Sequence, residues 1–244
     1  MTPCHPWGRS PGHREPVSFA SELRFAVGSV TDRAVSLAMT STCAVCYRED
    51  TRLCRDCRIA LRDRLRATPN DTEAQASRAL EPLAQIEWCA PYTGMTRRAI
   101  DRLSADGERL LSGPLGEAIA HRWRLAGGGG DIMVPVPASA AQNRNRGFDA
   151  AVLLARVAGA RLHLPVVEAL RRRSKRVPTP GEGFEVIAPQ RIVGRSVVLV
   201  DDVVGSGERL LASAVALLSA GARAVSAVTV ASDRPSRSEP PTLN

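Results

Sequence analysis

Two adjacent acids, Asp201 and Asp202, follow the apolar run VVLV at 197–200. An unbroken aliphatic run is typical of a parallel strand that is covered on both faces, and open α/β sheets bind ligands at the carboxyl ends of such strands. The acids are therefore candidate catalytic residues. Because carboxylates repel phosphate, we expect them to face sugar hydroxyls or Mg²⁺.

A short glycine-containing stretch after the acids is a candidate phosphate loop: Val204, Gly205, Ser206, Gly207, Glu208 and Arg209. Glycines permit a tight turn, and a helix predicted over 207–220 would offer unpaired N–H groups to an anion. Acids and loop together predict a sugar phosphate, with ribose over the acids and its 5′-phosphate in the turn. The alternative is an ordinary strand end followed by a plain Ser206 helix N-cap.

Four cysteines form two CxxC pairs separated by seven residues: Cys43, Cys46, Cys54 and Cys57. Four thiolates suit tetrahedral zinc, and a set of four leaves no open position, so we expect a structural Zn²⁺ site. The alternatives are unligated thiols or two disulfides. Cys4 and Cys89 stand apart from this pattern and are predicted to be bystanders.

Strand and helix patterns alternate over the rest of the chain, which favours an α/β fold with a mostly parallel sheet flanked by helices. The predicted strands are 86–92, 131–137, 196–203 and 222–232, and the predicted helices are 73–85, 95–104, 107–123, 148–162 and 207–220. Residues 171–191 are predicted to be a long loop, and the GGGG at 127–130 a turn. The predicted organisation is a weakly ordered extension at 1–40, a zinc module at 41–66, an α/β domain at 84–232 and a disordered tail at 233–244.

The chain of 244 residues carries a net charge of +8, almost entirely from arginine, since Lys175 is the only lysine. Such a charge suggests anionic partners, although a biased codon supply would give the same composition. No apolar run of 18 residues exists, so we expect no membrane span, and we predict a cytoplasmic protein with reduced cysteines.

Several ordered motifs resemble those of the ComF family, which joins cysteine knuckles to a type I phosphoribosyltransferase domain. The motifs are the acid strand, YTGMTRRAIDRL at 92–103, VPVP at 134–137 and RGFDAAVLLAR at 146–156. The resemblance implies a phosphoribosyltransferase fold that binds phosphoribosyl pyrophosphate (PRPP) with Mg²⁺ and transfers the phosphoribosyl group to a nitrogen nucleophile. It also implies a link to DNA uptake in natural competence, with competence-machinery partners, and a homodimer like those of many related transferases.

The family pattern also assigns a pyrophosphate loop after VPVP, here Ala138–Gln142, which includes Ser139, with added charge from Arg144 and Arg146. The sequence departs from the family at four places: GSGER replaces a loop resembling TTGAT, Asp149 replaces Asn, Ser104 replaces Lys, and 171–191 is a shortened hood. These departures leave open an inactive phosphoribosyltransferase-fold protein that acts in DNA uptake or nucleotide sensing. The basic charge keeps a third alternative, weak nucleic-acid contact, in view.

Overall fold

A computed structural model describes residues 42–49, 51–67, 80–138, 147–173 and 183–233. These residues belong to one compact unit, Thr42–Asn244. The predicted extension at 1–40 lies outside the described residues, as does the predicted tail apart from Asp233.

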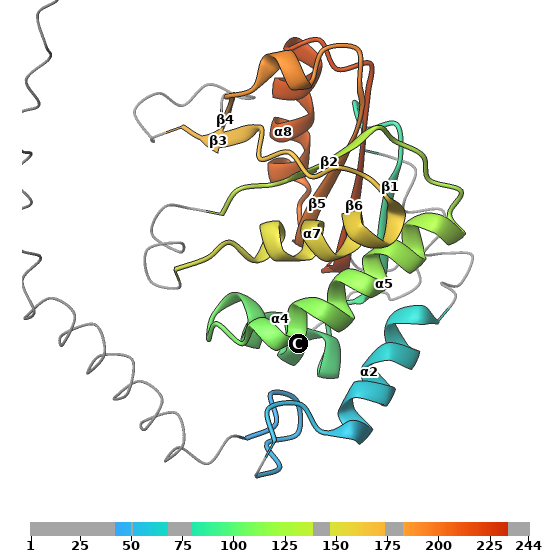
Figure 1. Ribbon diagram of the computed structural model, residues 1–244, viewed down its shortest axis with the longest axis vertical. Helices are drawn as coiled ribbons and strands as arrows, with labels where there is room; N and C mark the ends of the chain where they lie inside the picture. Colours follow the sequence, from blue (N-terminus) through green and yellow to red (C-terminus); the bar gives the residue numbers. More distant parts are fainter. Residues whose placement is uncertain (1–41, 50, 68–79, 139–146, 174–182, 234–244) are drawn as a thin grey trace, which may run out of the picture. The chain divides into compact units, whose positions relative to one another are not determined.

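Four parallel strands form the central sheet: β1 (Ile86–Pro91), β2 (Ile132–Pro135), β5 (Ser196–Val204) and β6 (Ala224–Ser232). Their order is β1-β6-β5-β2, so β5 is an interior strand with β6 and β2 as neighbours (Figure 1). Val200 pairs with Pro135 of β2, and Asp201 pairs with Thr229 of β6. The predicted parallel α/β fold is confirmed, and the predicted strands all lie in this sheet.

Helices cover both faces of the sheet. Alternate residues of a strand point to opposite faces, so each face of β5 packs into its own core. On one face Val198 and Val200 share a core with α4 (Gly94–Ser104), α5 (Ser112–Leu125) and α7 (Ala150–Leu162). On the other face Val197 and Leu199 share a second core with α8 (Glu208–Ser219). The two residues that follow in β5 continue this alternation, which decides where the acids point.

The cysteine-containing segment leads into α2 (Arg55–Arg66), whose first residues follow the N-cap Cys54. Leu61 and Leu65 of α2 are fully buried in the same core as Ala99 of α4 and Ala118 of α5. The cysteine module therefore has no separate core of its own. It packs on the face of the sheet that carries α4, α5 and α7.

The segment 171–191 differs from the predicted long loop. Strands β3 (Leu170–Arg172) and β4 (Phe184–Val186) pair antiparallel in a second, two-stranded sheet, and a 3₁₀ turn follows at Pro189–Arg191. Leu170 and Phe184 are buried in the α8-side core, which gives these short strands their anchor. Three-residue strands among arginines and prolines leave too little alternation to be recognised from sequence.

Two predicted helices also need correction. Of the predicted helix 73–85, residues 73–79 lie outside the described part, and 80–85 are not helical. Pro82 cannot donate the N–H that a helix interior requires. Residues 80–83 instead form a turn, closed by the N–H of Leu83 donating to Leu80, and Leu83 and Ile86 are buried before and at the start of β1. The predicted helix 107–123 instead begins at Ser112 after the 3₁₀ turn Arg109–Leu111, because Gly107 has a left-handed φ of +78°.

Among the described residues, no helix has both the length and the apolar character needed to cross a membrane.

Candidate functional site

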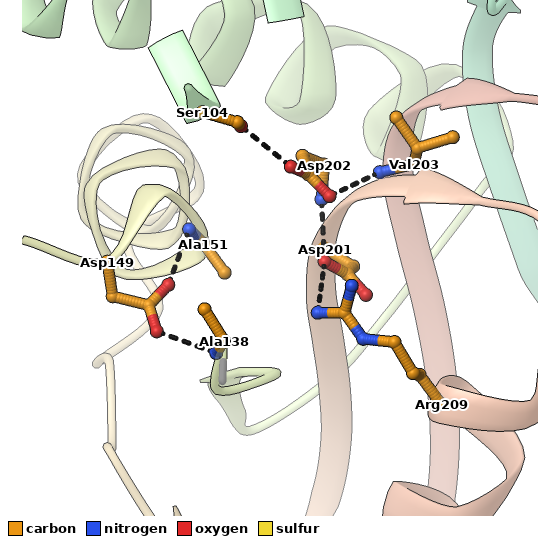
Figure 2. Close-up of polar contacts among 8 residues, drawn as sticks. All are labelled: Ser104, Ala138, Asp149, Ala151, Asp201, Asp202, Val203 and Arg209. Atoms are coloured by element: carbon orange, nitrogen blue, oxygen red, sulfur yellow. Dashed lines mark hydrogen bonds and ion pairs between the residues drawn. The ribbon is translucent and has the colours of Figure 1, made fainter. Parts of the chain in front are cut away.

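Asp201 and Asp202 lie at the carboxyl end of β5, but their side chains point to opposite faces of the sheet (Figure 2). Asp201 faces α8 and is only 2% exposed, whereas Asp202 faces α4 and is partly exposed. The structure therefore places the two acids toward the carboxyl end of the strand, as predicted, but in two different environments.

Asp201 is held by an ion pair with the first turn of α8. The Nη2 of Arg209 lies 3.2 Å from Oδ1 of Asp201, and the N–H of Asp202 donates to the same oxygen at 2.9 Å. Burial raises the pKa of Asp201 well above its usual range, the neighbouring charge of Asp202 raises it further, and Arg209 opposes both. Arg209 thus contacts an acid, in the loop where a 5′-phosphate was predicted.

Asp202 is positioned by the last residue of α4. The hydroxyl of Ser104 donates to Oδ2 of Asp202 at 2.7 Å, and the N–H of Val203 donates to Oδ1 at 2.8 Å. Nearby, Tyr92 hydrogen-bonds Asp101, and burial together with this bond raises the pKa of Tyr92 to about 12. In the sequence Ser104 stood out only as a departure from a family pattern, and no local signal pointed to its contact 98 residues away.

The turn after β5 has the geometry of a helix start. Gly207 is the residue before α8 and has a φ of +88°, a conformation that L residues rarely adopt, while Gly205 does not need a positive φ. The N–H of Glu208 donates to the hydroxyl of Ser206 at 3.4 Å, and Leu211 is the first residue to donate back to Gly207. The N–H groups of the first turn of α8 are therefore oriented toward any anion bound at the turn.

The start of the predicted pyrophosphate loop is tied to α7. Asp149 accepts the N–H of Ala151 at 3.0 Å as the N-cap of α7, and it accepts the N–H of Ala138 at 2.8 Å (Figure 2). A carboxylate thus already occupies the backbone N–H of Ala138, the first residue of the predicted pyrophosphate loop. The other predicted members of this loop, Ser139, Arg144 and Arg146, lie outside the described residues.

The four cysteines come together in one cluster, as their spacing predicted. Their sulfur atoms lie within 4.8 Å of one another, and those of Cys46 and Cys54 are 3.7 Å apart. Tetrahedral zinc with Zn–S bonds of about 2.3 Å requires sulfur separations of about 3.8 Å, so the donor set fits the metal. All four are free thiols, which differs from the two-disulfide alternative. Cys89 is also free, and it is buried in β1 as a packing residue.

One of these thiols is predisposed to ionise. Burial raises the pKa of Cys43, but the backbone N–H groups of Cys46, Cys54 and Val45 outweigh it and lower the pKa to about 6. A thiolate is the form that binds metal. Burial and the neighbouring thiols of the cluster raise the pKa of Cys57, so metal binding there would have to displace the Cys57 proton.

The two loop glycines make a matched pair for testing the turn. Gly207→Ala should cost about 1–3 kcal/mol of unfolding free energy, because alanine is strained at φ +88° and its Cβ would lie 3.0 Å from Leu80. Gly205→Ala should leave the melting temperature nearly unchanged, because a Cβ there meets no atom within 4 Å. Thermal melts of both variants check this, and equal melting temperatures would contradict the strained turn.

Residues 145–243, less than half of the chain, match the family described as Phosphoribosyl transferase domain. This region contains α7, both acids, the turn and the strands β5 and β6. No curated protein matches the sequence significantly.

Two solved structures show weaker likenesses. Glutamine phosphoribosylpyrophosphate amidotransferase from B. subtilis, complexed with ADP and GMP, has 18% identity and a TM-score of 0.37, over 50% of this chain and 26% of that one. A glutamic acid mutant from an analysis of an invariant aspartic acid in HPRTs has 15% identity and a TM-score of 0.33, over 56% of this chain and 73% of that one. The chain thus spans about a quarter of the amidotransferase.

The family match and the topology together define the class. The chain carries a phosphoribosyltransferase-type α/β domain, with a parallel sheet flanked by helices, joined to an N-terminal cluster of four cysteines.

Proposed function

We propose that this protein is a ComF-like phosphoribosyltransferase that binds PRPP with Mg²⁺ and transfers the phosphoribosyl group to a nitrogen nucleophile. One observation carries the proposal: two acids end an interior parallel strand and lead directly into a glycine turn that opens a helix, inside the region matching the phosphoribosyl transferase domain. That order places carboxylates and backbone N–H groups at one sheet edge, where ligands of such folds bind.

The two sides of the ligand would use different groups. Backbone N–H groups of residues 205–209 would hold the 5′-phosphate, and the partly exposed Asp202 would hold the ribose hydroxyls directly or through Mg²⁺. Ala138, Ser139, Arg144 and Arg146 would hold pyrophosphate, and Mg²⁺ would neutralise its charge as it leaves. In the reaction the C1–oxygen bond to pyrophosphate breaks, a C1–nitrogen bond forms, and the nitrogen loses its proton. Carboxylates near the ring would stabilise positive charge that develops on it.

The remaining elements of the proposal rest on the ComF resemblance. The four-cysteine cluster would hold a structural Zn²⁺ ion, and the protein would act in the cytoplasm, as a homodimer, in DNA uptake with partners from the competence machinery. The sequence motifs at 92–103, 134–137 and 146–156 support this assignment.

A second candidate is a phosphoribosyltransferase-fold protein that binds its ligand without turnover. Two contacts favour it: Arg209 reaches Asp201, and Asp149 already accepts the N–H of Ala138. Both contacts occupy groups that a catalytic PRPP site would use. Binding in DNA uptake or nucleotide sensing would require only the ribose and 5′-phosphate half of the site, which Asp202 and the backbone N–H groups of the turn would form without the side chains of Arg209 or Asp201.

Pyrophosphate release separates the two candidates. The zinc-loaded protein would be incubated with PRPP, Mg²⁺ and a panel of ammonia, amines and nucleobases. Catalysis predicts release with at least one acceptor, reduced about 10²-fold in Asp202→Asn and unchanged in the exposed control Asp63→Asn. If the folded, metal-loaded protein bound PRPP but released no pyrophosphate with any acceptor, the catalytic proposal would be wrong. The binding candidate would then remain.

A further inference from the structure

Helix α4 contacts both the cysteine module and the acid-bearing end of β5. Near the middle of the helix, Nε of Arg98 donates to the carbonyl oxygen of Val45 at 3.1 Å. At its last residue, the hydroxyl of Ser104 donates to Oδ2 of Asp202 at 2.7 Å (Figure 2). Arg98 and Ser104 are about 9 Å apart along the helix axis. A single helix therefore joins two places that the sequence separates widely.

The contact at Val45 lies inside the cysteine cluster. Val45 stands between Cys43 and Cys46, and its N–H hydrogen-bonds the thiol of Cys43. The residue is 1% exposed, so its carbonyl oxygen needs a donor from the protein, and Arg98 supplies one. Val45 thus contacts a metal-binding thiol on one side and α4 on the other.

The second cysteine pair is tied to the same helix through α2. Cys54 caps the start of α2, and Cys57 lies in its first turn. From the last turn of α2, the guanidinium of Arg64 donates to the hydroxyl of Thr96 at 3.3 Å and to that of Thr93 at 3.4 Å. Both halves of the cluster therefore hold the N-terminal half of α4, while the C-terminal end of α4 holds Asp202.

We propose that α4 couples the cysteine cluster to Asp202, so that metal bound by the cysteines strengthens PRPP binding at the end of β5. This proposal rests on the PRPP function proposed above. Arg98 and Ser104 are then positioning residues, which act through Val45 and Asp202. Without metal the two cysteine pairs are no longer held at one point, and the N-terminal half of α4 loses its fixed support.

The bond from Ser104 to Asp202 is sensitive to such a movement. At 2.7 Å it is a good hydrogen bond, but a shift of about 1 Å would carry the two oxygens beyond the range in which a side-chain hydrogen bond exists. Asp202 would then keep its bond from the N–H of Val203 and lose the one that orients its second oxygen. The carboxylate proposed to hold the ribose or Mg²⁺ would no longer be fixed in advance of binding.

The test uses the reciprocity of coupled binding. If metal strengthens PRPP binding, PRPP must strengthen metal binding by the same factor. The zinc affinity of the full chain would be measured by equilibrium competition with a zinc-chelating dye, with and without saturating PRPP and excess Mg²⁺. The wild type should bind zinc about tenfold more tightly when PRPP is present, which is within the usual range for two coupled sites.

Two variants and their controls locate the coupling. Ser104→Ala and Arg98→Met should still bind zinc by native mass spectrometry, but saturating PRPP should no longer tighten it. Ser104→Thr keeps the hydroxyl and should keep the tenfold effect, as should Arg62→Met, because Arg62 pairs with its neighbour Asp63. A general stabilisation of the fold by PRPP would protect zinc in every variant that PRPP saturates, so only a specific route through α4 gives this pattern.

The possible failures are distinguishable. If PRPP raises the melting temperature of the wild type without tightening zinc, the coupling is wrong and the PRPP function stands. If Ser104→Ala and Arg98→Met keep the full tenfold effect at saturating PRPP, α4 does not carry the coupling. If PRPP neither raises the melting temperature of the wild type nor tightens zinc, the proposed function fails, and this proposal fails with it.

Discussion

Cys57→Ser should remove the bound metal and lower the melting temperature of the whole compact unit by about 10 °C or more. Structural zinc contributes roughly 10–16 kcal/mol to the folding of small zinc modules, and even about 3 kcal/mol would shift a chain of this size by that amount. The effect should spread beyond the module, because Cys57 shares a core with Leu61 of α2 and Ala118 of α5. Native mass spectrometry should find one zinc per wild-type chain and none in the variant.

Cys89→Ala is the matched control, since Cys89 is equally buried but lies in β1 outside the cluster. It should keep its zinc and lose about 1 kcal/mol of unfolding free energy. Treating the wild type with a chelator should reproduce the loss seen in Cys57→Ser. A Cys57→Ser protein that keeps the wild-type melting temperature would show that the cluster is not a structural metal site.

Arg209→Gln should destabilise the ligand-free protein by about 1–2 kcal/mol at neutral pH, which is a fall of about 3–6 °C. The reason is that Asp201 is 2% exposed and would lose the charge that balances it. The expected destabilisation is smaller than that for a fully buried ion pair, because Arg209 is 41% exposed and its charge is screened by water. Arg209→Gln/Asp201→Asn should recover the lost stability, because no buried charge then remains.

The pH dependence has a definite sign. The pKa of Asp201 is raised in the fold, so the folded chain binds its proton more readily, and the stability cost of its charge grows as pH rises above about 4. The deficit of Arg209→Gln should therefore shrink as pH falls and Asp201 takes up a proton. The exposed pair Arg171–Glu185 supplies the control: Arg171→Gln should change stability by less than about 0.5 kcal/mol at any pH. If Arg209→Gln/Asp201→Asn did not recover the stability lost in Arg209→Gln, the Arg209–Asp201 ion pair would have no role in stability.

Patterns that are local in the sequence predicted the structure well. The VVLV run before Asp201 indicated a covered parallel strand, and β5 is one because apolar residues on both of its faces are buried. The helix predicted over 207–220 matches α8, and Gly221 just beyond it has the left-handed φ of +92° that ends helices. The CxxC spacing predicted a cluster of four sulfurs, because each pair can direct two thiolates to one point.

Features that depend on distant contacts were not predictable in this way. Adjacency of Asp201 and Asp202 suggested one shared ligand surface, but strand alternation turns their side chains to opposite faces. The partners that fix them, Ser104 and Arg209, are chosen by how α4 and α8 pack, which no local pattern encodes. Strands β3 and β4 were missed for the same reason, since Leu170 and Phe184 gain their burial from α8 and its core.

The central claim, a PRPP site at the end of β5, is tested most directly by a thermal melt with and without PRPP and Mg²⁺. Asp201→Asn/Asp202→Asn would be melted alongside, and the ligand-induced shift would be compared rather than the melting temperature itself. Ligand at about 100 times its Kd adds about 2.7 kcal/mol, so the wild type should rise by about 5–10 °C and the double variant should not. No rise in the wild type at saturating ligand, or an equal rise in both proteins, would contradict the account.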